Sequence, residues 1–180
     1  MTSPFANDYS VTVSENRIID TIDRHILTIL QADARISNAE IARQVGLAPS
    51  AVLERIRKLE ERGIIRGYHT DIDPRSVDFG LTVFVAVKTS ECGSVAEQEL
   101  SAIPEVLEVH DVAGEDSFWL KIRTKDTEEL GRLLREKIKP IPNVLGTHTT
   151  VVLQTFKETN TLPIDVPFDE RPSKAAKAKK

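Results

Sequence analysis

The spacing of apolar residues changes part-way along this 180-residue chain. Before residue 64 they recur every three or four positions, which is typical of one face of a helix. From Leu81 onward they form short runs rich in Val, Phe and Thr, which favour strands. A chain of this length has room for two small domains, so the sequence predicts an α+β fold, with a helical unit followed by a unit built on a sheet.

Two short helices are predicted first, because each has a recognisable start. Asp20 and Asp23 place carboxylates where the free amides of a helix N-terminus favour negative charge, and this helix is expected to end near Gln31. Residues 37–40 (SNAE) match a capping box, in which a serine and a glutamate side chain each satisfy a free amide. Gly46 is expected to stop the second helix, because glycine readily adopts the left-handed conformation.

A third helix is predicted from Pro49 to about Arg62, since proline suits the first position of a helix. Its apolar stripe consists of Val52, Ile56 and Leu59. Gly63 is expected to end it before a β-prone run at 64–68 (IIRGY), which predicts a short strand. Two helices joined by a tight turn, with a helix before and a strand after, form a winged helix-turn-helix, although any small helical bundle can share this pattern.

The rest of the chain predicts a mixed order of strands and helices. We expect β-α-β-β-α-β, with strands at 81–89, 106–112, 118–124 and 147–156 and helices at 95–102 and 126–139. This order is the ferredoxin-like pattern, in which two helices cover one face of a four-stranded antiparallel sheet. Because the strands carry apolar residues on both sides, we expect a partner subunit to cover the other face.

The expected domain division follows from these elements. It consists of a disordered N-terminus at 1–16, a winged helix-turn-helix at 17–69, a linker at 70–80, a ferredoxin-like domain at 81–157 and a disordered, Pro- and Lys-rich tail at 158–180. The single cysteine, Cys92, excludes an internal disulfide. No apolar run approaches the roughly 20 residues that span a bilayer, so we expect a cytoplasmic protein without a membrane partner.

The formal net charge of −4 is a sum of unlike segments. Residues 1–16 carry −2 and residues 68–170 carry −9, whereas residues 17–67 carry +2 and residues 171–180 carry +5. The whole-chain value alone argues against nucleic-acid binding. The separate values indicate instead two domains with different partners, although blocks of charge are also common on plain solvated surfaces.

Short motifs follow one another in order through both units. They are 20–23 (DTID), 26–27 (IL), 34–37 (ARIS), 41–42 (IA), 45–47 (VGL), 55–60 (RIRKLE), 63–65 (GII), 67–68 (GY), 104–106 (PEV) and 113–121 (AGEDSFWLK). In these motifs the chain resembles the leucine-responsive and asparagine regulator family (Lrp/AsnC), the feast/famine transcription factors. The resemblance implies dimers that are built by the sheets, are often assembled into octamers, bind pseudo-palindromic promoter DNA and respond to a small effector, usually an amino acid.

The resemblance makes the third helix the recognition helix, which enters the major groove of double-stranded DNA. With its apolar stripe turned inward, helical geometry places the candidate DNA-binding residues on the outer side or beside it. They are Ser50, Ala51, Glu54, Arg55, Arg57, Lys58 and Arg62. Arginine can pair with guanine, glutamate with cytosine, and serine or lysine with phosphates. The alternative is that Arg57 and Lys58 only pair with glutamates on the same helix.

The resemblance also implies an effector site near the turn between the second and third predicted strands. The candidate residues are Gly114, Glu115, Asp116 and Ser117. Backbone amides at Gly114 could hold a carboxylate, and Glu115 or Asp116 an ammonium group; the alternative is a plain polar β-turn. Many family members have Asp where Ser117 stands, which leaves the effector preference open. A second departure is Ala48, which cannot cap the third helix as the family's frequent serine does.

No catalytic set is recognisable, so we expect neither an enzyme nor a cofactor nor a metal site. The four histidines are scattered, and no Gly-rich phosphate loop or metal-binding His pair occurs in the sequence. Two other functions stay open at this point. Sirohaem decarboxylases resemble the same two-domain architecture, and an amino-acid-sensing subunit that binds another protein would have no affinity for DNA.

Overall fold

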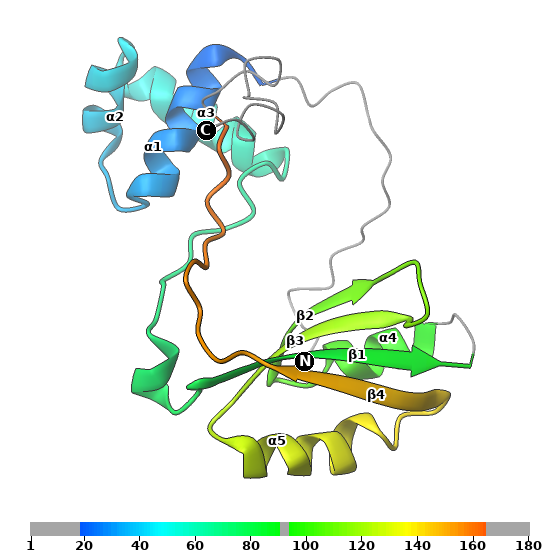
Figure 1. Ribbon diagram of the computed structural model, residues 1–180. Helices are drawn as coiled ribbons and strands as arrows, with labels where there is room; N and C mark the ends of the chain where they lie inside the picture. Colours follow the sequence, from blue (N-terminus) through cyan, green and yellow to red (C-terminus); the bar gives the residue numbers. More distant parts are fainter. Residues whose placement is uncertain (1–18, 91–93, 165–180) are drawn as a thin grey trace, which may run out of the picture. The chain divides into compact units, whose positions relative to one another are not determined.

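The computed structural model describes residues 19–90 and 94–164 (Figure 1). The chain divides into two compact units, of which the second is Thr70–Glu158 and the first combines the residues before and after it. The predictions for residues 1–16 and Cys92 lie outside the described residues. In the part of the chain that is described, no helix is long and apolar enough to cross a membrane.

The first unit contains the three predicted helices, α1 (Thr21–Ala32), α2 (Asn38–Val45) and α3 (Pro49–Glu61). Their starts and stops are the predicted ones. The Asp20 side chain accepts a hydrogen bond from the Asp23 amide at 2.7 Å, and Gly46 ends α2 in the left-handed region at a φ of 71°. Residues from all three helices form the core: Ile26, Ile41, Ala42, Val52 and Ile56. The helix-turn-helix is therefore confirmed.

Half of the predicted capping box at the start of α2 is present. The Ser37 hydroxyl oxygen accepts a hydrogen bond from the Glu40 amide at 3.2 Å. The Glu40 carboxylate turns along the helix, where it contacts Arg43 and accepts a hydrogen bond from Gln44 at 3.3 Å. A charged partner one turn away competes successfully with a backbone amide for this carboxylate.

The short strand predicted at 64–68 is wrong, because the structure assigns no strand to these residues. The amides of Ile64 and Ile65 both donate to the Leu59 carbonyl, at 2.9 and 3.1 Å, so they close the end of α3. Ile65 also packs against the core of the first unit. Strand formation needs a neighbouring strand for these amides, and here their partner is the helix end.

The second unit has the predicted ferredoxin-like order. Its elements are β1 (Leu81–Thr89), α4 (Ser94–Ser101), β2 (Val106–Asp111), β3 (Phe118–Thr124), α5 (Thr127–Leu133) with a π-helical turn (Leu134–Ile138), and β4 (Val144–Val151). The strands lie in the order β2-β3-β1-β4, and all neighbours are antiparallel. A short 3₁₀ helix, Pro74–Val77, occupies part of the predicted linker.

One face of this sheet carries the hydrophobic core. Val83, Val85 and Val87 alternate along β1 and are fully buried, and Leu120 and Ile122 of β3 lie beside them. Residues of the helices and their ends cover them, among them Leu100, Leu130, Leu133 and Ile138. No helix among residues 19–90 and 94–164 covers the face that bears Phe84 and Trp119, and we call it the open sheet face.

The last strand was predicted at 147–156 but runs from Val144 to Val151. Its pairing with β1 explains where it ends. Val151 lies opposite Val83, the Val152 amide donates to the Thr82 carbonyl at 3.0 Å, and β1 begins at Leu81. Beyond this point β4 has no neighbour to pair with, so the apolar residues that follow do not extend it.

The beginning of the predicted disordered tail is ordered. Glu158 forms ion pairs with Lys121 and Arg123 of β3. Residues 159–164, which we call the C-terminal strap, belong to the first unit, where they form hydrogen bonds to α1. The prediction of disorder from residue 158 is therefore wrong for 158–164, and the remaining tail lies outside the described residues.

Candidate nucleic-acid interface and effector turn

Helix α3 separates its apolar stripe from its polar residues. Val52, Ile56 and Leu59 are buried against the other helices of the first unit. The N-cap Ala48 makes no side-chain bond, and Pro49 occupies the first turn, as expected. Most of the predicted DNA-binding residues are exposed on the outer side: Ser50, Glu54, Arg57, Lys58 and Arg62. Ala51 and Arg55 are half-buried at the edge of this surface.

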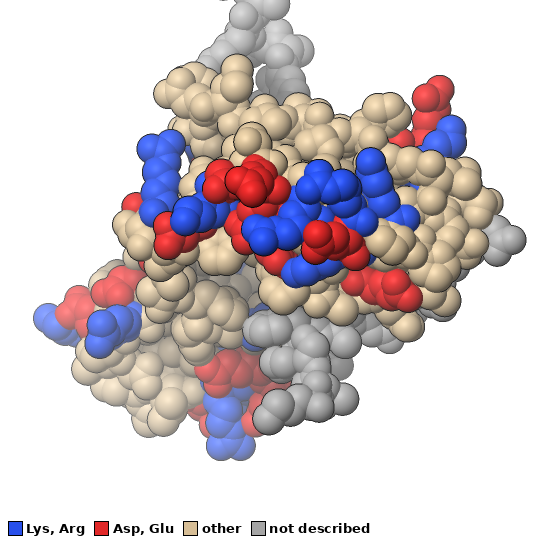
Figure 2. Space-filling model, turned by 90° about the horizontal axis from the view of Figure 1, so that it is seen from below, with Lys and Arg blue, Asp and Glu red and all other residues tan. Residues whose placement is uncertain are grey.

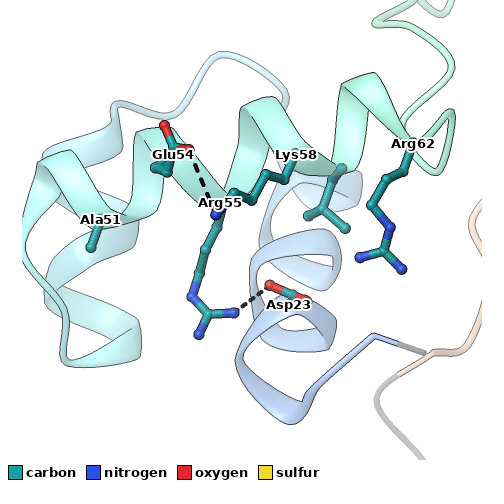
Figure 3. A pocket seen from close by; sticks show the side chains of 7 residues that line it. Asp23, Ala51, Glu54, Arg55, Lys58 and Arg62 are labelled. Atoms are coloured by element: carbon teal, nitrogen blue, oxygen red, sulfur yellow. Dashed lines mark hydrogen bonds and ion pairs between the residues drawn. The ribbon is translucent and has the colours of Figure 1, made fainter. Parts of the chain in front are cut away.

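A hollow of about 340 Å³ lies between α3 and the start of α1 (Figure 3). It is lined by Asp23, Ala51, Glu54, Arg55, Lys58, Leu59 and Arg62. The structure thus brings five of the seven predicted DNA-binding residues to one hollow, and it adds one carboxylate from α1. Ser50 and Arg57 lie outside this lining.

Arg55 differs from the other basic residues because its side chain points toward α1 (Figure 3). Its terminal nitrogen Nη1 lies 2.7 Å from a carboxylate oxygen of Asp20 and 2.7 Å from one of Asp23. The Asp23 amide, together with this guanidinium, holds the pKa of the Asp20 carboxyl below its usual value. The two carboxylates raise the pKa of Arg55 in turn. The arrangement joins the start of α1 to the middle of α3.

Arg57 and Lys58 are exposed and each faces a glutamate on the same helix. The Nε of Arg57 donates to Glu61 at 2.9 Å, and the Nζ of Lys58 lies 3.6 Å from Glu54 (Figure 3). Helical pairing, the alternative to DNA contact, is therefore the arrangement in this structure. Exposed pairs of this kind contribute little to stability, so they are easily exchanged for phosphates.

Two residues near this surface were not predicted. Leu53 is 55% exposed on α3, and it could have been found because it lies outside the apolar stripe. The Tyr68 hydroxyl donates to Glu60 of α3 at 2.9 Å, and partial burial with this carboxylate raises the pKa of Tyr68 to about 12. No sequence pattern indicated that this tyrosine lies against α3.

The predicted effector residues occupy the turn between β2 and β3, but they are not equivalent. Gly114 and Glu115 are exposed. Ser117 is held by β1, because its amide donates to the Val87 carbonyl at 2.9 Å and its hydroxyl oxygen accepts from the Thr89 amide at 3.2 Å. Of the four, Ser117 is thus a structural anchor of the turn.

Asp116 points to a second hollow, of about 240 Å³, on the open sheet face. Phe84, Ala86, Asp116, Trp119, His148 and Thr150 line it. The pairing of Ala86 with both Trp119 and His148 aligns these three residues across the sheet. The His148 Nδ1 lies 3.9 Å from an Asp116 oxygen. Trp119 and His148 were missed as site residues, since their neighbours depend on strand register.

Known protein families match each of the two units. The Lrp/AsnC ligand binding domain matches residues 82–162, and a winged helix-turn-helix DNA-binding domain matches residues 19–66. The HTH-type transcriptional regulator FL11 of Pyrococcus horikoshii is 43% identical over 148 residues, which cover 81% of this chain and 97% of that protein. The leucine-responsive regulatory protein of Escherichia coli K12 is 40% identical over 150 residues, 81% of this chain and 92% of that one.

A solved structure shares the fold as well. A feast or famine regulatory protein from M. tuberculosis, complexed with L-methionine, superposes with a TM-score of 0.75 at 36% identity, over 81% of this chain and 99% of that chain. One of these relatives is a transcriptional regulator by name and the other two are regulatory proteins, and each match covers about four fifths of this chain. The chain therefore belongs to the Lrp/AsnC family of transcriptional regulators.

Proposed function

We propose that this regulator binds pseudo-palindromic promoter DNA through α3, as a dimer or a larger assembly, and that an amino acid binds near the 114–117 turn. The observation that carries the proposal is the division of α3 into a buried apolar stripe and an exposed face rich in Arg, Lys and Glu. Such a face can enter the major groove without disturbing the core of the unit.

On this proposal the outer residues of α3 have different roles. Arg57 and Lys58 exchange their exposed glutamate partners for phosphates or guanine edges. Glu54 can accept a hydrogen bond from a cytosine amino group, and the exposed Leu53 can pack on a thymine methyl. Ser50 and Arg62 lie toward the two ends of α3 and are assigned to phosphates. Arg55 is assigned to holding α3 against α1.

Dimerisation is proposed to bury the open sheet face. Phe84 and Trp119 are 38% and 51% exposed there, which is unusual for side chains of this size. The helix-covered side of the second unit is charged instead. α5 and its π-helical turn, lowest in Figure 1, face the viewer in Figure 2, where basic and acidic side chains alternate along a band. Interface cores are depleted of charge and enriched in aromatic residues, so the open face suits pairing better.

Replacing Trp119 by Glu is expected to break the dimer, and with it any octamer. In a two-fold interface each substitution places a charge at the contact twice, and the apolar area of the ring is lost. The molar mass from light scattering should fall to that of a 20.1 kDa monomer. Val95→Glu is the matched control, because Val95 is 50% exposed on α4. An unchanged mass for the Trp119 variant, or an equal fall for both, contradicts this interface.

The effector is proposed to be an amino acid, and the structure of the M. tuberculosis relative in complex with L-methionine supports this class of ligand. Asp116 is the better partner for its ammonium group, since Asp116 lines the hollow on the open sheet face while Glu115 is exposed at the turn. Backbone amides near Gly114 can donate hydrogen bonds to its carboxylate.

Calorimetry against the twenty amino acids tests this assignment. We expect heat with one or a few of them, and Asp116→Asn should weaken that binding about tenfold or more, because a charged hydrogen bond contributes roughly 1.5–3 kcal/mol. Glu115→Gln should change it less than twofold. Heat with none of the amino acids, or greater sensitivity at Glu115, argues against the assignment.

A further inference from the structure

The chain leaves β4 through residues 152–158, which we call the exit segment, and both ends of this segment are fixed to the sheet. At its start the Val152 amide donates to the Thr82 carbonyl of β1 at 3.0 Å. At its end Glu158 forms an ion pair with Arg123 of β3 at 2.6 Å. Thr82 and Arg123 are direct partners in the pairing of β1 with β3, so the exit segment begins and ends at the same end of the sheet.

This end of the sheet belongs to the open sheet face and is neutral. Side chains alternate along a strand, so Lys121 and Arg123 lie on the face that bears Trp119. Their side chains are only 15% and 14% exposed, and both pair with Glu158. Lys121 also pairs with Glu108 at 2.9 Å. Two cations and two carboxylates therefore balance each other, and a partner needs no opposite charge to lie here.

The exit segment carries two large apolar side chains that face water. Leu153 is 96% exposed and Phe156 is 88% exposed, the highest values among the large apolar residues of the described chain. The exposed fraction of Phe156 about equals those of Phe84 and Trp119 together, which are 38% and 51%. The exit segment thus roughly doubles the exposed aromatic area beside the open sheet face.

This area matters for a stable dimer. A buried aromatic side chain removes roughly 150–250 Å² from water, and a standard interface takes about 800 Å² from each partner. By this measure the exposed parts of Phe84 and Trp119 supply at most about a quarter of what each partner needs. Phe156 supplies about as much again, and Leu153 adds to it.

We propose that the exit segment extends the dimer interface, and that Leu153 and Phe156 pack against a second copy of this chain. The inference rests on the proposed dimer through the open sheet face. A neutral, apolar surface suits a copy of itself, because the same patch meets twice across a two-fold axis. It does not suit a phosphate backbone, which binds to unpaired cations.

The first experiment measures the dissociation constant of the dimer by sedimentation equilibrium of the full chain. Leu153→Asp and Phe156→Asp are each expected to raise it at least 100-fold, because each places a charge in the interface twice. Both side chains are exposed in the single protomer, so far-UV circular dichroism should be unchanged. Val95→Asp on α4, where the side chain is 50% exposed, is the control and should change the constant less than twofold. Equal effects of the control and the two variants overturn the proposal.

The second experiment uses Trp119, the only tryptophan of the chain. Tryptophan emission moves to longer wavelength when the ring is exposed to water. On dilution the wild-type emission should make this shift as the dimer dissociates, and Phe156→Asp should make it at a concentration at least 100-fold higher. If Phe156→Asp shifts the emission at every concentration and leaves the dimer mass unchanged, the exit segment covers its own sheet, and the proposal is overturned.

The inference and the proposed dimer fail separately. If the Leu153 and Phe156 variants remain dimers while Trp119→Glu is a monomer, the interface is confined to the strands, and only the role of the exit segment is lost. If Trp119→Glu also remains a dimer, the proposed interface is contradicted, and the inference is contradicted with it.

Discussion

Replacing Arg57 and Lys58 together by Ala is expected to weaken promoter binding about 10- to 100-fold at low salt. Both side chains are exposed on α3 and have only weak glutamate partners to lose. The loss of two phosphate or base contacts should also lower the slope of log K against log salt by about 1.8 per protomer. Gel-shift titrations at two or more salt concentrations measure both quantities.

The matched control removes the same charge from the second unit. Arg132→Ala with Lys139→Ala changes two exposed basic residues, one on α5 and one directly after its π-helical turn. We expect this pair to leave promoter affinity within about twofold. These charges can act on DNA only over a long distance, and salt largely screens such interactions. If the α3 pair leaves both affinity and slope unchanged, α3 is not the DNA-binding surface.

Arg55→Met is expected to destabilise the first unit by about 1–3 kcal/mol. Asp23 is only 8% exposed, and the substitution removes the guanidinium that lies 2.7 Å from its carboxylate, so a nearly buried charge loses this partner. For a unit of this size each 1 kcal/mol lowers Tm by roughly 4–8 °C. Differential scanning calorimetry should therefore show the unfolding of the first unit several degrees earlier.

A second variant shows whether the stability is lost through side-chain packing or through the unpaired charge. Arg55→Met combined with Asp23→Leu removes both buried charges, and it should recover much of the lost stability because well-packed apolar replacements of an ion pair are often neutral. If Arg55→Met alone unfolds at the wild-type temperature, the ion pairs that join Arg55 of α3 to the start of α1 contribute nothing to stability.

The ion pair between Asp20 and Arg55 predicts that stability depends on pH. The folded-state pKa of Asp20 is depressed, so its contribution is present above its unfolded pKa, near 3.9, and is lost as the pH falls through the lower folded value. Wild-type stability should therefore decline below about pH 4. The decline should be shallower for Arg55→Met, since Arg55 is one of the groups that lower this pKa. Equal slopes for the two proteins contradict this assignment.

The helices and strands whose caps, stop residues and apolar spacing lie close together in the sequence were predictable from it. Phe118–Thr124 and Leu81–Thr89 form strands with the expected ends, α1 and α2 begin at their expected caps, and α3 begins at Pro49. Each signal lies within a few residues of the element that it defines. The strand predicted at 64–68 does not form, and the last strand forms with shifted ends, because strand pairing depends on a neighbour whose position is not a local property.

The residues of the candidate sites show the same limit to prediction from sequence. A helical wheel places Arg55 beside the outer face of α3, but its partners Asp20 and Asp23 lie more than thirty positions earlier in the chain. Trp119 and His148 meet at one hollow only through the register of β3 and β4 on β1. The strap was missed because Gln31 binds its backbone, and backbone recognition leaves no pattern in the side chains.

The most direct test of the account is to select fragments of genomic DNA with the purified protein and to sequence them. The wild-type chain should enrich discrete sites that share a pseudo-palindromic motif, with half-sites about one helical turn, 10–10.5 base pairs, or a multiple of it apart. The Arg57→Ala, Lys58→Ala chain should lose these sites, whereas the Arg132→Ala, Lys139→Ala chain should keep them. Fragments without a shared motif, or the same sites retained by the α3 variant, would contradict sequence-specific DNA binding by α3.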